Sequence, residues 1–516
     1  MAGAGPWCDL VTPSVDGLRN TLECFLREAS MEHYLHFSGQ KETLEIFPIV
    51  LRHADVFIPD AVHTALAARD ATADPTDRRR ATALAQAVAE LCMERDLAML
   101  ADELATAQAQ ATVTVGGETL PYHGVAVAVQ NEPDRERRRA LDRARLAEVA
   151  RLDPLRERLL RRHHQAIQEL GFESYTSFYA TLKGIDLHRL GATVSGFLDR
   201  TRDLYLENLV PWFEEVIGVP FAQAERHDAA VLFRMRERDA CFRAERMVPA
   251  LRETLLRLGV ALDDQPNVHL DTEDRPRKNP RAFCVAVQSP GEVYLVTRPT
   301  GGYQDWRALF HEAGHTEHYA HVEAARPFEE RLLGDNSVTE AYAFSLEHLL
   351  LDAAWLAEHT EATGEELRSL LHRVHVYYLY MIRRYAAKLL YELELHAAAP
   401  GDLAAMPARY AELLSGHLGF AHPTETWLDD LDAGFYASQY LRAWMLEAQL
   451  REHWRKARGD RWWASAQTGA EMRGLWSLGQ ALPADMVAAE LGMERLDDAA
   501  LERRIREGLA PAMRPG

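Results

Sequence analysis

Helical periodicity runs through most of this chain and constrains its fold more than any other feature. Long segments rich in Ala, Leu, Arg and Glu repeat apolar residues at spacings of three and four, as a helix with one buried face requires. We expect such helices over residues 78–108, 134–169, 187–216, 222–258 and 367–395. The sequence therefore predicts a mainly α-helical protein.

Two stretches have instead the composition and the turn residues of β-hairpins. The first pairs residues 112–115 with residues 118–127 across two glycines, and the second pairs 282–288 with 293–297 across Ser-Pro-Gly. We find no internal repeat and no low-complexity tract. The expected β-structure is therefore a small addition to a helical fold.

Charge and composition exclude several classes of function. The formal net charge is −20, which argues against a nucleic-acid partner because phosphates need a basic surface. No stretch approaches the ~20 apolar residues of a membrane span, and the N-terminus lacks the basic and apolar regions of a signal peptide. The five cysteines include no CxxC pair, which favours a reducing compartment. We expect a soluble, cytoplasmic protein with no membrane or nucleic-acid partner.

The segment HEAGH, residues 311–315, matches the metal-binding pattern HExxH. Residues 303–322 are expected to form a helix, so that His311 and His315 project from one face, about one turn apart. Two imidazoles at this spacing can bind one zinc ion. Glu312 lies beside them and can act as a general base without binding the metal. The sequence therefore predicts one zinc ion per chain.

A tetrahedral catalytic zinc site needs a third protein ligand. His321 has the spacing of a third histidine but would need a break in the helix, so we reject it. Asp335 falls in a segment typical of a turn. We favour Glu340, near the start of a helix expected over residues 339–351. The alternative is a capping box from Ser337 to Glu340, in which Glu340 would bind backbone.

The segment HEAGHTEH, residues 311–318, resembles the HExGHxxH motif of the zinc oligopeptidase family that includes thimet oligopeptidase, neurolysin and oligoendopeptidase F. The spacing from His315 to Glu340, the presence of Glu347 further on and the upstream strand hairpin also fit that family. Residues 435–444 are similar to the tyrosine-bearing helix of its bacterial members. Glu347 also suits a hydrogen-bond acceptor for a ligand histidine.

The resemblance implies a two-lobed helical ellipsoid with a deep substrate channel and a small β element beside the zinc site. No linker marks a boundary, and we place one near residue 200, between an N-terminal helical region that caps the channel, residues 1–200, and a zincin catalytic region, residues 201–516. The resemblance further implies that His422, Tyr436 and Tyr440 stabilise the transition state. Short peptides are the expected partners, and zinc is the expected cofactor.

These patterns predict a zinc metallopeptidase of the oligoendopeptidase type, with His311, His315 and Glu340 as metal ligands and Glu312 as general base. Three alternatives remain. The chain could be a zinc carboxypeptidase or dipeptidase, or a peptidase dedicated to one precursor peptide. It could also be a non-catalytic, peptide-binding protein on a former peptidase scaffold.

Substrate binding is expected to use backbone pairing and one basic side chain. Residues 293–297, or whichever strand lies at the edge of the cleft, can pair with a peptide by strand addition. Arg281, Arg298 and Arg442 lie near the motifs in sequence. One of them could bind a substrate carboxylate, and a structural ion pair is the alternative for each.

Overall fold

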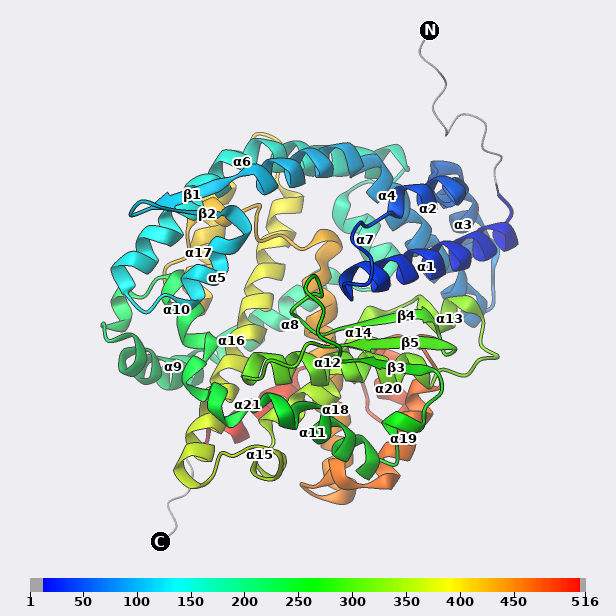
Figure 1. The fold of residues 1–516 in the computed structure, drawn as a ribbon. Helices are drawn as coiled ribbons and strands as arrows, with labels where there is room; N and C mark the ends of the chain where they lie inside the picture. The colour runs from blue at the N-terminus through cyan, green and yellow to red at the C-terminus, as the bar shows by residue number, and fades with distance from the viewer. Residues whose placement is uncertain (1–12, 511–516) are drawn as a thin grey trace. The chain divides into compact units, whose positions relative to one another are not determined.

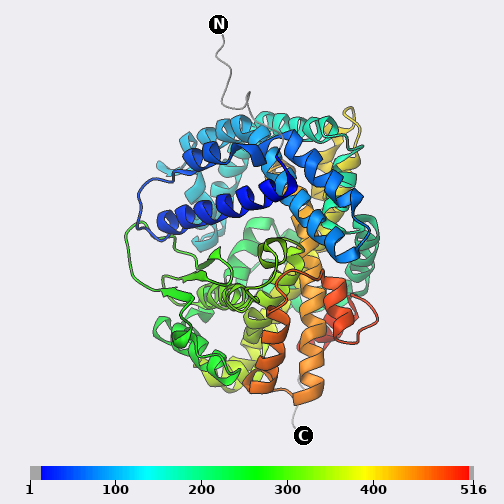
Figure 2. The same ribbon diagram turned by 90° about the vertical axis from the view of Figure 1, so that its right-hand side faces the viewer.

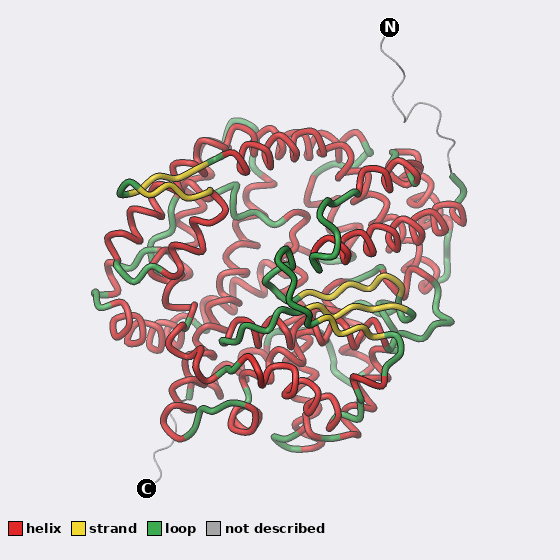
Figure 3. Tube along the Cα trace, viewed as in Figure 1, coloured by secondary structure: helices red, strands yellow, loops and turns green. Residues whose placement is uncertain are grey.

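The chain folds mainly into α-helices, drawn in red in Figure 3, with two small sets of strands. This confirms the predicted fold class. The structure is a computed structural model, and it describes residues 13–510. Within that range no helix is long and apolar enough to cross a membrane.

The chain forms two compact units, each made of three separate segments. Unit 1 comprises Met1–Cys92, Arg236–Leu371 and Arg442–Leu501, and unit 2 comprises Met93–Met235, His372–Leu441 and Glu502–Gly516. The chain passes from one unit to the other four times inside a helix, namely in α4 (Pro75–Gln110), α16 (Gly364–Ala397), α18 (Tyr436–Arg458) and α21 (Ala499–Leu509).

Unit 1 is built around a three-stranded sheet. The strands β3 (Val268–Asp271), β4 (Phe283–Gln288) and β5 (Glu292–Val296) are ordered β3-β5-β4, with β5 parallel to β3 and antiparallel to β4. Helix α1 (Val15–Phe37) lies along β4, as Figures 1 and 2 show. Helix α12 (Tyr303–Ala320) packs against β4 and β5, and α14 (Asn336–Glu347) packs against α12.

The remaining helices of unit 1 surround this centre. They are α2 (Ile46–Arg52), α3 (Pro59–Ala71), α11 (Ala244–Arg257), α13 (Phe328–Leu332), α15 (Ala353–His359), α19 (Ala466–Trp476) and α20 (Ala484–Glu490). Aromatic side chains fix the rotation of α12: Trp306 and Phe310 are fully buried, and the ring of Phe310 meets that of Trp355 at 4.9 Å. Because these rings occupy one side of α12, its histidines point to the other side.

Unit 2 contains a hairpin of β1 (Thr112–Val115) and β2 (Glu118–Pro121) and a set of helices. The helices that lie wholly in this unit are α5 (Tyr122–Asn131), α6 (Arg135–Glu169), α7 (Tyr175–Lys183), α8 (Leu187–Arg200), α9 (Arg202–Ile217), α10 (Arg226–Arg234) and α17 (Met406–Leu418).

The structure corrects the first predicted hairpin. Its second strand was expected to run to residue 127, but it ends at Pro121 and the chain continues as α5. The reason is helical spacing: Val125 and Val129 are one turn apart and form one buried cluster with Val113 and Leu141. In a strand Val127 would share the face of Val125 and Val129, but its side chain is 61% exposed, so only a helix accounts for this pattern of burial.

Two predicted helices are also interrupted. Residues 187–216 break at Thr201, where α8 ends and α9 begins. Residues 222–258 form α10 and α11 with a 3₁₀ segment, Arg236–Cys241, between them. Met235 ends α10 in the left-handed region, with φ of 47°. The second hairpin is confirmed as β4 and β5, and β3 is an additional strand that the sequence pattern did not indicate.

Candidate metal centre

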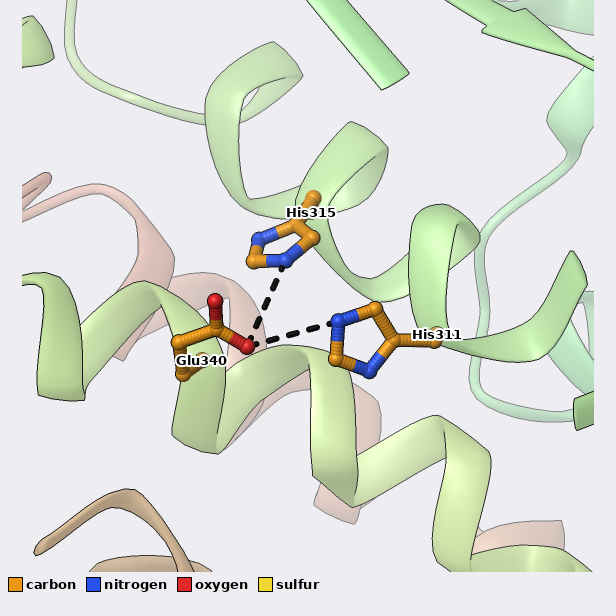
Figure 4. Close-up of side chains that lie close together, drawn as sticks. All are labelled: His311, His315 and Glu340. Atoms are coloured by element: carbon orange, nitrogen blue, oxygen red, sulfur yellow. Dashed lines mark ion pairs between the residues drawn. The ribbon is translucent and has the colours of Figure 1, made fainter. Parts of the chain in front are cut away.

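The predicted metal ligands come together between α12 and α14 of unit 1. Glu340 Oε2 lies 3.3 Å from His311 Nε2 and 3.7 Å from His315 Nε2, as the dashed lines in Figure 4 indicate. One ligand atom from each residue lies within 4.8 Å of the others. Within residues 13–510, these three residues form the group of His, Cys, Asp or Glu side chains whose ligand atoms lie close enough together to hold a metal ion.

The spacing of these atoms suits a zinc ion. Zinc binds imidazole nitrogen and carboxylate oxygen at about 2.0–2.2 Å, so that tetrahedral ligand atoms lie about 3.4 Å apart. The two distances from Glu340 bracket that value. Two imidazole nitrogens and one carboxylate oxygen are also the donor set that catalytic zinc sites use. The residues present therefore fit zinc with a fourth position left for water or substrate.

Both histidines are oriented through Nδ1, which leaves Nε2 directed at the metal position. His311 Nδ1 lies 2.7 Å from Glu347 Oε2, and Glu347 Oε1 lies 3.1 Å from Arg307 Nη1. Burial opposes ionisation of Glu347, but the charges of Arg307 and His311 lower its pKa to about 2. Glu347 is therefore an ionised acceptor that orients a ligand ring, as its position in the sequence predicted.

The second histidine is oriented by a residue that the sequence analysis did not identify. His315 Nδ1 lies 2.8 Å from Thr339 Oγ1, and His318 Nδ1 lies 3.1 Å from the same oxygen. Thr339 directly precedes Glu340 on α14. One residue thus couples the ring of the second ligand to the helix that supplies the third.

The first turn of α14 decides between the alternatives for the third ligand. Asp335 is the N-cap: its Oδ1 accepts from Ser337 N at 2.9 Å, and its Oδ2 lies 3.0 Å from Arg442 Nη2. Asp335 therefore caps the helix rather than facing the histidines, and Glu340 is not needed as a capping residue. His321 is the C-cap of α12, with Nδ1 2.8 Å from Glu317 O, and does not join the cluster.

Glu312 is held beside the metal position by the sheet. Its Oε2 accepts a hydrogen bond from Cys284 N at 2.9 Å, and burial raises its pKa to about 7 although His311 acts in the opposite direction. In an antiparallel pair alternate N–H groups point away from the partner strand. The N–H of Cys284 therefore lies on the edge of β4 that β5 does not occupy.

The sheet order removes residues 293–297 as the expected substrate-binding strand and leaves the other alternative, a strand at the edge of the sheet. Residues 293–297 largely form β5, which is central because β3 and β4 flank it. Its backbone groups are already paired in the sheet. The edge beside Glu312 belongs to β4, so strand addition near the metal position would involve β4 instead.

The three arginines considered for carboxylate binding differ in their surroundings. Arg442 contacts Asp335 at 3.0 Å and Asp485 at 2.8 Å, and Arg298 contacts Asp274 at 2.8 Å. These two form ion pairs. Arg281 is exposed, and its side chain makes no hydrogen bond or ion pair within the part of the chain that the structure describes.

The residues predicted to stabilise the transition state belong to unit 2. His422 is buried, and its Nδ1 lies 3.0 Å from Phe420 O. A carbonyl only accepts, so the neutral ring carries its proton on Nδ1 and leaves Nε2 as an acceptor. The rings of Tyr436 and Tyr440 lie 5.0 Å apart, and Tyr440 also meets Tyr385 at 5.1 Å. The catalytic role of these three residues stays a prediction.

No family model matches the chain, and no curated protein matches it in sequence. The candidate site is therefore defined by the geometry of its own side chains.

Proposed function

We propose that this chain is a zinc metallopeptidase that hydrolyses short peptides, as the resemblance of its motif to the oligopeptidase family suggests. One observation carries the proposal: His311, His315 and Glu340 converge on one point, and Glu312 is held beside it. A chance HExxH segment would not be expected to meet a third ligand at zinc spacing, nor to have both imidazoles oriented by hydrogen bonds at Nδ1.

The residues divide the chemistry between them. A zinc ion at this site supplies a Lewis acid that polarises the scissile carbonyl and brings the pKa of a bound water toward ~7. Glu312 takes a proton from the attacking water and returns it to the leaving amine. Because Cys284 N–H holds one carboxylate oxygen of Glu312, the other oxygen is available for that proton.

The edge of β4 offers a way to bind the peptide backbone. An extended peptide that pairs with this edge would run past Glu312, since Cys284 N–H already reaches that carboxylate. Recognition through backbone groups requires an unfolded segment and depends little on side-chain identity. These properties support short peptides as substrates.

Cysteine usage supports a reducing, cytoplasmic location for this activity. Cys24, Cys92, Cys241 and Cys284 form no disulfide, and Cys8 lies outside the described residues. Structural disulfides are common in secreted proteins and rare in the cytoplasm.

The test is mass spectrometry of a mixed peptide library after incubation with the zinc-loaded protein, with and without a chelator. Internal cuts that disappear with the chelator are expected. Glu312→Gln should retain zinc and lose at least ~100-fold in turnover, the scale of general-base catalysis. Glu323→Gln, an exposed glutamate just after α12, is the matched control and should cut normally.

Three results would contradict the proposal: cuts that persist in the chelator, full turnover by Glu312→Gln, or no cuts at all from the zinc-loaded protein. Peptides blocked at both ends separate an endopeptidase from a carboxypeptidase or dipeptidase, because an exopeptidase needs a free end.

A further inference from the structure

Arg226, the first residue of α10 in unit 2, is a charged side chain without a partner. It is half-buried, and its guanidinium makes no hydrogen bond or ion pair with any residue between 13 and 510. A partly buried charge costs free energy unless an opposite charge or hydrogen-bond acceptor meets it. The formal net charge of the chain is −20, so acidic partners are abundant elsewhere.

Asp430 and Asp142 raise the pKa of Arg226, but each makes its direct contacts with other groups. Asp430 pairs with Arg384, accepts from Tyr410 OH at 2.8 Å and lies 3.8 Å from Lys388 Nζ. Asp142 lies 3.7 Å from Arg145. Arg226 therefore lies near acidic groups that favour its charge but makes no direct contact with either carboxylate.

A short backbone pairing places Arg226 beside His422. Glu225 and Ala421 form a parallel bridge, in which Arg226 N donates to Ala421 O at 3.0 Å. The next residues on the two segments, Arg226 and His422, are consequently neighbours across this bridge. Burial and the nearby charge of Arg226 lower the pKa of His422 to about 3. His422 is therefore neutral and offers an acceptor at Nε2.

A phenol completes the group. Tyr380 of α16 stacks on Phe233 with ring centroids 4.0 Å apart, and Arg384 and Arg226 both lie near enough to lower the pKa of its hydroxyl against the effect of burial. That hydroxyl has no hydrogen bond within residues 13–510. Arg226, Tyr380 and His422 thus present a cation, a neutral donor and an acceptor.

We propose that Arg226, with Tyr380 and His422 beside it, binds the terminal carboxylate of a peptide. A guanidinium binds a carboxylate through two parallel hydrogen bonds, and a phenol can donate a third. The amide N–H next to a C-terminal carboxylate suits the acceptor at His422 Nε2. The inference rests on the proposed function, which makes peptides the ligands of this protein, and all three residues belong to unit 2.

The experiment compares two forms of one ligand, a five-residue peptide with neutral side chains as the free acid and as the C-terminal amide. Isothermal titration calorimetry on the full zinc-loaded chain carrying Glu312→Gln measures binding without turnover. The free acid should bind at least ~10-fold more tightly, as expected for a charge-assisted hydrogen-bonded pair. Adding Arg226→Gln should reduce this preference to about twofold or less and leave binding of the amide unchanged.

Arg202→Gln removes an exposed arginine from the same unit and should keep the preference for the acid. An unchanged preference in Arg226→Gln, an equal loss for acid and amide, or no binding of either form would overturn the inference. Failure of the proposed function looks different. If the parent protein cuts no peptide while the acid preference is present and depends on Arg226, the carboxylate site is supported and the peptidase assignment is contradicted.

Discussion

The hydroxyl of Thr339 lies between two imidazoles of α12, 2.8 Å from His315 Nδ1 and 3.1 Å from His318 Nδ1. When His315 binds metal through Nε2, its Nδ1 carries a proton and needs an acceptor. Thr339→Val keeps the shape of the side chain but removes that acceptor. We expect this variant to bind zinc about 10–100-fold more weakly, the usual effect of losing such a partner, as measured by competition with a chromophoric chelator.

Two further variants make the Thr339 prediction specific. Thr339→Ser keeps the hydroxyl and should bind zinc nearly as well as the parent. Thr316→Val removes another buried hydroxyl from α12, one that donates to the backbone oxygen of Glu312 at 2.8 Å, and should also leave zinc affinity nearly unchanged. Equal zinc affinity in Thr339→Val and the parent would show that the hydroxyl does not orient the ligand.

Residue patterns could predict the part of the site that depends on local helix geometry. The HExxH spacing places His311, Glu312 and His315 because a helix turns through a fixed angle per residue. Thr339 and the backbone N–H of Cys284 were missed, since their roles depend on which elements pack together. A polar residue immediately before the third ligand was the available signal for Thr339.

Gly314 sets how closely α12 and α14 approach. A Cβ at this position would lie 2.5 Å from Ala343 Cα and 2.7 Å from Tyr342 O, and these backbone atoms cannot move unless α14 moves. We expect Gly314→Ala to reduce the free energy of unfolding by about 1–3 kcal/mol, the range for overpacking. It should also weaken zinc binding, because Glu340 would shift away from the histidines.

The matched control for Gly314 is Gly474→Ala in α19. A Cβ there would meet nothing within 4 Å, so this change should be neutral or stabilise by up to ~1 kcal/mol through helix propensity. Urea unfolding and a chelator titration measure both effects. A Gly314→Ala protein with parent stability and zinc affinity would mean that the helices tolerate a wider separation.

The N-cap of α14 gives a separate prediction for the same element. Asp335→Ala removes the acceptor of Ser337 N and should cost about 1–2 kcal/mol of unfolding free energy. Asp335→Asn keeps a capping oxygen and should cost less, even though it loses the charge that faces Arg442. Equal costs for the two variants in urea unfolding would assign the stabilisation to the ion pair with Arg442, which both variants lose, and not to the cap.

Element types were predicted well where a long pattern had one period, and poorly where packing decided. α6 and α16 follow the expected helices closely. Residues 122–127 were assigned to a strand because they continue the segment after the two-glycine turn of a predicted hairpin, yet Val125 and Val129 pack as a helical pair against Val113. Strand β3 has four residues, too few for an alternation to be recognised, and it forms only because β5 offers an edge.

At the scale of the whole molecule, no single point in the sequence divides the chain into its two compact units. Each unit takes three segments, and most of the passages between units fall inside long helices that carry no Pro- or Gly-rich linker. A sequence pattern marks boundaries through such linkers. The division could therefore not be predicted from composition, since it depends on which helices pack together.

Three histidines of unit 2 lie around the ring of Tyr175: His396, which is buried, and His163 and His164, which are partly buried. His164 Nε2 lies 2.9 Å from His396 Nδ1, and His163 Nε2 lies 3.0 Å from Tyr179 OH. Burial lowers the pKa of His163 to about 4, and it also lowers the pKa values of His164 and His396. All three rings are therefore neutral in the folded protein at pH 7.

Protonation of the unfolded chain then makes stability depend on pH. An unfolded histidine has a pKa near 6.5. The stability that the protein loses when unfolded histidines bind protons and folded ones do not is therefore fully present above that pH and is lost as the pH falls toward 4. For His163 alone the loss between pH 7.5 and pH 5 is about 2 kcal/mol. His163→Gln should be less stable than the parent at pH 7.5. Between pH 7.5 and pH 5, however, its free energy of unfolding should fall by about 2 kcal/mol less than that of the parent, as measured by urea unfolding at both pH values. His188→Gln, at an exposed position of α8, should lose as much as the parent. If His163→Gln also lost as much, His163 would have to titrate in the folded protein much as it does in the unfolded chain, and its burial would not be the source of acid sensitivity.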